Sequence, residues 1–274
     1  MKSPIRIPAR QILRWLLNRC ARQYGDEEMR RRAMVFAPHF DDETLGCGGT
    51  VLRKKQAGAD VKIAFMMDCG QSHQGVMSPD EIKEIRRREG LAACRQLGLS
   101  ESDVFLLNQS ERGLVSCRKQ AMEAVAALLK QQQPEEVFVP YYRDVHPDHV
   151  ATNAVVRTVL DASGARVTVF EYPIWFWRHW PWVGLPLSSR GQAIAIIKSS
   201  IFSRLGLRML LEFTCTVRIA DVLQQKLAAM QQHRSQLTRL KQDARWPTLR
   251  DIDHGEFLKC FMQKNEVFHR YTIG

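Results

Sequence analysis

The stretch Ala33 to Thr50, AMVFAPHFDDETLGCGGT, predicts a buried strand, a polar turn and a helix in immediate succession. Four apolar residues from Met34 to Ala37 fit a strand of a parallel sheet, and Pro38 follows them. Polar side chains at the carboxyl end of such a strand lie where open α/β sheets bind their ligands. We therefore expect the functional site to lie directly after this strand.

Three side chains in this turn suit a metal site. His39 and Asp42 are three residues apart, so a tight turn can point both side chains at one metal ion. Asp41 between them would then be free to accept a proton from a water molecule beside the metal. The alternative is that Asp41, Asp42 and Glu43 only cap the helix and place favourable charges at its start.

A second strand, turn and helix repeats this arrangement. Residues 136–140, EVFVP, are typical of a strand, and YYRDVHPDHVATNAVV follows them. In this sequence His146 and His149 flank Pro147 and Asp148 at the start of a helix. Two turns that together supply three histidines and three aspartates favour a metal site over simple capping. The spacing alone permits either His146 or His149 as a ligand.

The two motifs resemble the signature sequences of the LmbE-like, or PIG-L, family, zinc enzymes that remove the acetyl group from N-acetylglucosamine-type sugars. The family pattern is PHPDDE followed by a glycine-rich helix start, with HPDH further along the chain. Phe40 stands where the family usually has proline, which leaves the stiffness of the turn to packing. The resemblance spans residues 33–268, and its further matches are Arg86 with Glu89, Glu171-Tyr172-Pro173, and HRSQ from His233 to Gln236.

The resemblance implies a ligand set and a reaction. His39, Asp42 and His149 would bind Zn²⁺, or Fe²⁺ or another divalent metal in its place. Asp41 would act as the general base and His146 would donate a hydrogen bond to the developing oxyanion. Asp148 would orient His146. Of the further matches, Arg86 and His233 would contact the substrate.

The alternation of strands and helices along the chain predicts an α/β fold. We expect a Rossmann-like, mostly parallel sheet with helices on both faces and the metal site at the carboxyl ends of the strands. Strands are expected at 34–37, 61–67, 104–107, 137–140, 167–171 and 215–219, and helices near 43–57, 79–97, 116–132, 147–162 and 220–242. Ser72 and His73 follow the second strand and are candidates for substrate contact, although an ordinary solvated loop explains them equally.

Composition narrows the class of protein. A chain of 274 residues is long enough for one large α/β domain, and seven cysteines without a C-x-x-C pair favour a reducing compartment. The net charge of +11 raises nucleic-acid binding as a possibility. The basic residues are dispersed, however, and no nucleic-acid-binding motif is present, so no specific nucleic acid is expected. An anionic substrate or an anionic lipid explains the charge as well.

Residues 1–32 are expected to form a basic amphipathic helix ahead of a deacetylase domain at 33–274. Arg10 and Arg14 share one face of this helix, and Arg14 and Asn18 interrupt the apolar run that an export signal would need. Such a helix lies on an anionic membrane, packs on the sheet, or packs on another subunit of a homo-oligomer. The apolar residues at helical spacing are Ile12, Leu13, Leu16, Leu17, Cys20 and Tyr24.

A Trp-rich insertion is expected at about 174–213. Its tryptophans are Trp175, Trp177, Trp180 and Trp182. Aromatic clusters stack on sugars, meet membranes or anchor partners, and core packing is the alternative. Lys198, Arg204 and Arg208 break the apolar stretch that follows, which favours a lid or an interfacial hairpin over a transmembrane span.

The sequence therefore predicts a cytoplasmic metal-dependent hydrolase, and peripheral contact with the inner face of the membrane is a further expectation. Its substrate would be an N-acetylglucosamine-type sugar, free, nucleotide-linked or lipid-linked. A metal-dependent phosphoesterase would use similar His and Asp ligands and is the alternative enzyme. A basic membrane or nucleic-acid adaptor with a vestigial site is the alternative from another class.

Overall fold

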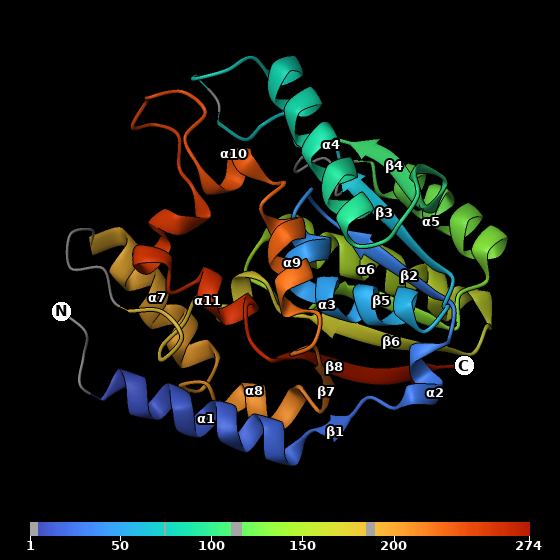
Figure 1. Cartoon of the computed structure of the whole chain (residues 1–274), viewed down its shortest axis with the longest axis horizontal. Helices are drawn as coiled ribbons and strands as arrows, with labels where there is room; N and C mark the ends of the chain where they lie inside the picture. Colours follow the sequence, from blue (N-terminus) through green and yellow to red (C-terminus); the bar gives the residue numbers. More distant parts are fainter. Residues whose placement is uncertain (1–4, 74, 111–116, 185–189) are drawn as a thin grey trace.

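An eight-stranded sheet forms the centre of the computed structural model, which describes residues 5–73, 75–110, 117–184 and 190–274 (Figure 1). The strands are β1 (Arg22–Gln23), β2 (Ala33–Ala37), β3 (Val61–Met67), β4 (Val104–Gln109), β5 (Glu136–Pro140), β6 (Val167–Tyr172), β7 (Cys215–Arg218) and β8 (Asn265–Ile273). Their order is β1-β7-β8-β6-β5-β2-β3-β4. Only β8 is antiparallel to its neighbours, β6 and β7, so the prediction of a mostly parallel sheet is confirmed.

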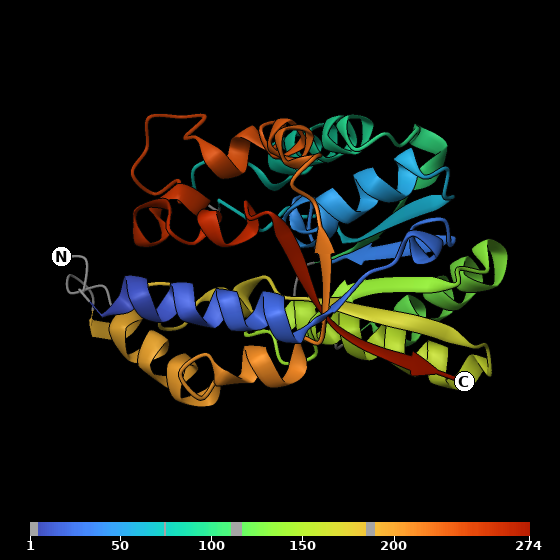
Figure 2. The same cartoon turned by 60° about the horizontal axis from the view of Figure 1, so that its bottom comes forward.

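Helices cover both faces of the sheet, as predicted. In Figures 1 and 2, α3, α4 and α9 lie on one face, and α5 and α6 lie on the other. The α-helices are α1 (Arg6–Cys20), α2 (Asp26–Met29), α3 (Asp42–Gln56), α4 (Pro79–Gln96), α5 (Arg118–Gln132), α6 (Pro147–Ser163), α7 (Arg190–Phe202), α8 (Leu207–Glu212), α9 (Leu223–Met230), α10 (Arg234–Leu237) and α11 (Leu258–Phe261). Short 3₁₀ helices are η1 (Glu101–Asp103), η2 (Trp175–Trp177) and η3 (Leu249–Gly255).

Two predicted elements differ from the structure. The single helix expected at 220–242 is wrong, because α9 ends at Met230 and α10 begins at Arg234. His233 between them leaves the helical conformation, and its buried ring meets Glu43 of α3 at 3.1 Å, which fixes the break. Strand β8 was missed because His269 and Arg270 interrupt its apolar pattern. The expected start of α5 at residue 116 lies outside the described residues.

Gly46 allows α3 to lie directly on Tyr172 at the end of β6. A Cβ atom at Gly46 would come within 2.3 Å of the Tyr172 ring, whose hydroxyl donates a 2.8 Å hydrogen bond to the Phe36 carbonyl of β2. Gly46, the first glycine of the GCGG sequence, is therefore required because helix and sheet pack closely at this point.

We expect Gly46→Ala to lower the free energy of unfolding by about 1–3 kcal/mol, the usual cost of overpacking a core. Gly191→Ala is the control, because a Cβ there meets no atom within 4 Å. Urea denaturation of both variants tests this. Equal stability of the two variants would mean that α3 and Tyr172 separate without cost.

The helix expected over residues 1–32 is shorter in the structure, because α1 ends at Cys20 and Arg22 and Gln23 join the sheet as β1. Helix α1 packs on the rest of the chain with Arg6 and Arg10 facing the protein. Leu13 and Leu17 are buried, as the apolar stripe predicts. Arg6 pairs with Asp253 at 2.5 Å, and Arg10 pairs with Glu256 at 2.6 Å, so the arginine face is not the solvent face. None of the helices in the described part of the chain has the length and hydropathy needed to span a bilayer.

The tryptophans of the insertion have different surroundings. Trp177 and Trp182 are buried and pack edge to face with ring centroids 4.7 Å apart. Trp180 is half-buried. Trp175 lies beside Phe257, with ring centroids 5.2 Å apart, and one side of it faces the cavity described below. Core packing therefore accounts for two of the four. Residues 185–189 of the predicted insertion, like residues 1–4 of the predicted N-terminal segment, lie outside the described residues.

Candidate metal and catalytic site

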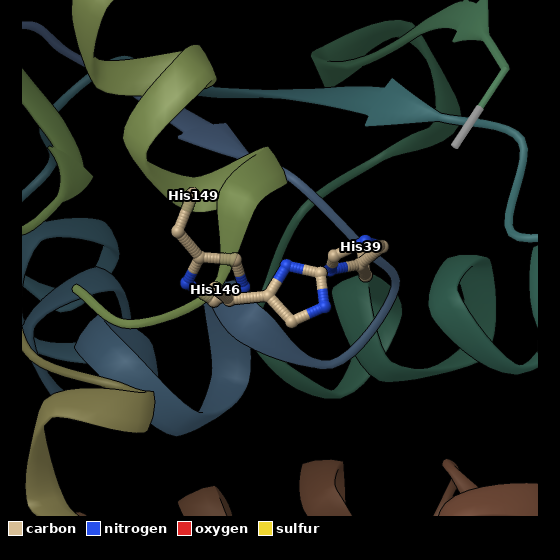
Figure 3. A group of neighbouring side chains, drawn as sticks. All are labelled: His39, His146 and His149. Carbon is tan, nitrogen blue, oxygen red and sulfur yellow. The ribbon is translucent and has the colours of Figure 1, made fainter. Parts of the chain in front are cut away.

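The turns after β2 and β5 meet at the carboxyl edge of the sheet, because these two strands are neighbours. One oxygen of Asp42, Oδ2, lies 3.2 Å from Nδ1 of His39 and 3.2 Å from Nε2 of His149. Figure 3 shows the rings of His39, His146 and His149 close to one another. The two sequence motifs therefore form one cluster.

The His39, Asp42 and His149 side chains fit a metal ion. Bonds of about 2.0–2.2 Å from nitrogen and oxygen ligands to a tetrahedral zinc place the ligand atoms about 3.3 Å apart. The two 3.2 Å separations match this spacing. Among the described residues, neither ring nitrogen of the buried His149 has a hydrogen-bond partner of good geometry. These unsatisfied nitrogens are expected of an imidazole that is shaped to bind a metal.

A second ligand set shares two of these residues. Ligand atoms of His39, His146 and His149 all lie within 4.8 Å of one another, which is also compatible with one ion. The geometry therefore permits either Asp42 or His146 as the third ligand beside His39 and His149. The sequence spacing left a similar choice between His146 and His149.

Carboxylates make the centre of the cluster favourable for a positive charge. Burial alone would lower the pKa of His149, but Asp42 and Asp144 outweigh burial and raise this pKa to about 10. Burial would raise the pKa of Asp42, but the charge of the nearby His149 ring and the hydrogen bond with His39 hold it below its ordinary value. A cation at this point, whether proton or metal, is thus stabilised by its surroundings.

Asp144 is a site residue that the sequence analysis missed. Its Oδ2 lies 3.6 Å from Nδ1 of His149 and accepts backbone N–H groups of Ile174 and Trp175 at 3.1 and 2.9 Å. Asp144 therefore holds the outer side of His149, a predicted ligand, and fixes the loop after β6. The available signal was its place in YYRDVHPDH, but a charged residue in a loop has no specific meaning by itself.

We expect Asp144→Asn to weaken metal binding by about 10–100-fold, because a carboxylate behind a ligand imidazole fixes its orientation and raises its basicity. The matched control is Asp161→Asn, since Asp161 is exposed on the same helix as His149. Competition against a chelator measures the affinity. Identical affinities for the two variants would remove Asp144 from the site.

Asp41 does not act as a helix cap. It occupies the N-cap position of α3, but among the described residues its side chain makes no capping hydrogen bond. Its φ of +129° is strained for a residue with a side chain, a feature that clusters at functional sites. The carboxylate lines the cavity and lies 3.4 Å from Nη2 of Arg86. Burial raises the pKa of Asp41 to about 6, although Arg86 opposes the rise.

The ring of His146 is oriented by the backbone N–H of Asp148. The backbone N–H of Asp148 donates to Nδ1 of His146 at 3.3 Å, so the neutral ring carries its proton on Nε2. The carboxylate of Asp148 lies closer to His39, with Oδ2 at 3.3 Å from Nε2 of His39 and 3.9 Å from Nδ1 of His146. Burial, with His149 and His39 adding to it, lowers the pKa of His146 to about 4. The expected orienting contact of Asp148 is therefore made by its amide rather than its carboxylate.

A cavity of about 210 Å³ lies over the cluster. Ser72 and Arg86 line it, as expected for substrate contacts. His73 and His233, the other two candidates for substrate contact, are not among its lining residues. His73 stacks on Trp246 with ring centroids 4.2 Å apart, and His233 is buried against Glu43. The remaining lining residues are His39, Asp41, Asp42, Leu45, His146, Asp148, Ile174, Trp175, Gln236 and Leu249.

Phe40 stiffens the turn by packing, in the place of the proline. Its ring lies over Gly90 of α4, where a Cβ would be 2.3 Å from the ring, and over Phe65, with ring centroids 4.4 Å apart. Glu89, next to Gly90, accepts hydrogen bonds from the amide and hydroxyl of Ser235 at 2.8 and 2.6 Å. Helix α4 thus fixes both the metal turn and the segment that carries Gln236 to the cavity.

A known protein family matches the part of the chain that carries this site. The family model described as PIG-L, GlcNAc-PI de-N-acetylase, matches residues 34–160. The chain is 26% identical over 222 residues to the probable N-acetyl-alpha-D-glucosaminyl L-malate deacetylase 2 of Bacillus cereus, an alignment that covers 78% of this chain and 88% of that protein.

Solved structures share the fold at low identity. The N,N'-diacetylchitobiose deacetylase from Pyrococcus horikoshii has a TM-score of 0.60 at 19% identity, with 98% of this chain and 93% of that chain covered. The 4-carboxy-2-hydroxymuconate hydratase from Pseudomonas putida has a TM-score of 0.58 at 15% identity, with 89% and 96% covered. The fold therefore hosts more than one reaction. The family model covers both turns of the candidate site, so residues 34–160 are similar to the LmbE-like, or PIG-L, family that the two motifs resemble.

Proposed function

We propose that this chain is a metal-dependent amide hydrolase that removes the acetyl group from an N-acetylglucosamine-type sugar, with zinc as its metal. The observation that carries the proposal is the cavity-lining carboxylate of Asp41 directly beside the His39, Asp42 and His149 cluster. The PIG-L match over the same residues and the deacetylase relative of Bacillus cereus support the choice of substrate.

The residues divide the work of hydrolysis. His39, Asp42 and His149 would hold the metal, which when bound supplies a positive charge that acidifies water and polarises a carbonyl. Asp41 accepts the proton of the attacking water, and its contact with Arg86 holds the carboxylate towards the cavity. His146 donates its Nε2–H to the oxygen that gains negative charge as water adds to the acetamide. Its amide contact with Asp148 keeps the proton on that nitrogen.

The form of the sugar and the way it enters the cavity are also part of the proposal. A free, nucleotide-linked or lipid-linked sugar would enter over Trp175, whose ring offers an apolar face for stacking on a sugar. A cytoplasmic location is part of this proposal, as is the division into an N-terminal segment at 1–32 and a deacetylase domain at 33–274.

Acetate release separates this function from its alternatives. The zinc-loaded chain should release acetate from at least one member of a panel of free, nucleotide-linked and lipid-linked N-acetyl sugars. Phosphate release, measured in parallel, would favour the phosphoesterase. A chain that binds metal and releases neither product would contradict the hydrolase proposal and favour the adaptor with a vestigial site.

A further inference from the structure

Exposed apolar side chains are concentrated on one part of the molecule. Of the thirteen large hydrophobic residues exposed among the described residues, ten belong to α1, α7, α8 and the residues directly joined to them. We call these ten the apolar face, and its members are Ile5, Ile12, Trp15, Ile194, Ile197, Ile201, Phe202, Leu205, Leu207 and Leu211. In Figures 1 and 2, α1, α7 and α8 lie together on the side of the molecule away from α4.

The helical spacing shows that this exposure is organised. Ile194, Ile197 and Ile201 fall on one side of α7, at exposed fractions of 45–70%. Ile12 and Trp15 fall on one side of α1, at 57% and 62%. Exposed apolar side chains gathered on neighbouring helices of a folded chain mark an interaction site.

The turn between α7 and α8 presents two more side chains. Arg204, Leu205 and Gly206 all have positive φ, which bends the chain sharply and leaves Arg204 and Leu205 exposed at the turn. Gly206 lies against Leu13, where a Cβ would come within 2.8 Å, so the turn is seated on α1. The helices are thus fixed relative to one another.

The charge of α1, α7 and α8 indicates what kind of partner binds the apolar face. Residues 5–20 and 190–211 contain eight arginines and lysines and no aspartate or glutamate. Three of the arginines are neutralised by ion pairs: Asp253 of η3 pairs with Arg6, Glu256 with Arg10, and Glu212, the last residue of α8, with Arg208. Within the described residues, no ion pair is found for Arg19, Arg190, Lys198 or Arg204.

We infer that the apolar face and these basic residues form a docking surface for an anionic lipid bilayer, with the isoleucines and Trp15 inserted at the interface and the basic side chains at the lipid phosphates. A second copy of this chain is disfavoured, because a two-fold contact through this surface would place unpaired arginines against one another. The surface uses α1 and the stretch after the tryptophans, as the sequence suggested, but not the tryptophans themselves. Trp177 and Trp182 are buried, Trp175 and Trp180 are half-buried, and the exposed side chains are mainly isoleucine and leucine.

The docking surface is connected to the catalytic cavity. The segment that carries Trp175 continues to Trp180, whose backbone N–H donates to Ser200 of α7 at 2.9 Å. It reaches Trp182, which lies under the Arg14 guanidinium of α1 at 5.2 Å from the ring centroid. A bilayer bound at α1 and α7 would therefore lie next to the segment that lines the cavity. The link to a lipid-linked sugar rests on the proposed function, whereas lipid binding itself does not.

Vesicle flotation of the full chain tests the inference. The parent should float with phosphatidylcholine vesicles that contain phosphatidylglycerol at low salt, and should float less with phosphatidylcholine alone or at high salt. The variant Ile194→Ser, Ile197→Ser, Ile201→Ser should bind about 10²-fold more weakly, because three apolar side chains no longer enter the bilayer.

The charge contribution is tested with a matched pair of variants. Arg190→Gln, Lys198→Gln, Arg204→Gln should bind about 10²-fold more weakly and lose most of the salt dependence. The control Lys119→Gln, Lys130→Gln, Arg166→Gln removes the same charge from exposed positions on α5 and after α6 and should bind like the parent.

Three results would overturn the inference. They are a parent that stays at the bottom in every condition, a control that loses as much binding as the charge variant, and a parent dimer that the isoleucine variant disperses without any lipid binding. Acetate release from a soluble N-acetyl sugar separates this from the proposed function. A parent that floats but releases no acetate contradicts only the enzyme, and one that releases acetate but does not float contradicts only the docking surface.

Discussion

The His149→Gln variant should lose its metal, whereas His146→Gln should keep it. Asp42 Oδ2 lies 3.2 Å from both His39 Nδ1 and His149 Nε2, so these three atoms can ligate one ion. His146 stands at the N-cap of α6 with Nδ1 occupied by the Asp148 amide. Elemental analysis of the purified variants should find about one metal per chain in the parent and in His146→Gln, and little in His149→Gln.

The same pair of variants decides between the two ligand sets. If His39, His146 and His149 bind the ion together, both variants will lose it. With Asp42 as the third ligand, only His149→Gln loses metal, and His146→Gln lowers kcat by about 10²–10³-fold through loss of an oxyanion donor. His254→Gln is the control, because His254 is exposed on η3 and should leave metal content and activity unchanged.

The two turns of the candidate metal site were predictable because the residues that form them are local in sequence. His39 and Asp42 follow β2 directly, and His146 and His149 begin α6, so each pair is placed by its own strand and helix. The parallel pairing of β2 with β5 then brings the two pairs together. Local pattern and sheet topology were sufficient for this part of the site.

The outer residues of the site were not predictable, because long-range packing places them. Gln236 and Leu249 reach the cavity from segments whose path depends on the break after α9, which the sequence pattern does not mark. His233 was expected at the substrate, but its burial against Glu43 makes it a support for the metal turn. The motif identifies the histidine but does not indicate whether its ring points into the cavity or into the core.

The exposed side of α1 was likewise not predictable from the sequence. Periodicity identified the helix and the burial of Leu13 and Leu17. It did not predict that Arg6 and Arg10 would face acidic residues of the C-terminal region, which leaves Ile12 and Trp15 exposed. Ion pairs between residues more than 240 positions apart cannot be read from helical spacing.

Asp41→Asn should retain the metal of the parent and lose about 10²–10⁴-fold in kcat, the usual contribution of a general base. Asparagine keeps the shape of the side chain and can still contact Arg86, but its amide cannot accept a proton from water. Asp42→Ala is the comparison, since it removes a ligand oxygen and should lose metal and activity together.

The two variants separate base from ligand only if metal content and turnover are measured on the same preparations. Because Asp41 lies at an N-cap position without capping α3, its replacement should leave the free energy of unfolding nearly unchanged. A loss of activity with full metal and full stability therefore has to come from proton transfer. If Asp41→Asn loses metal as Asp42→Ala does, Asp41 is a ligand, and the base must be sought among the other cavity-lining side chains, of which Asp148 beside His39 is the nearest candidate.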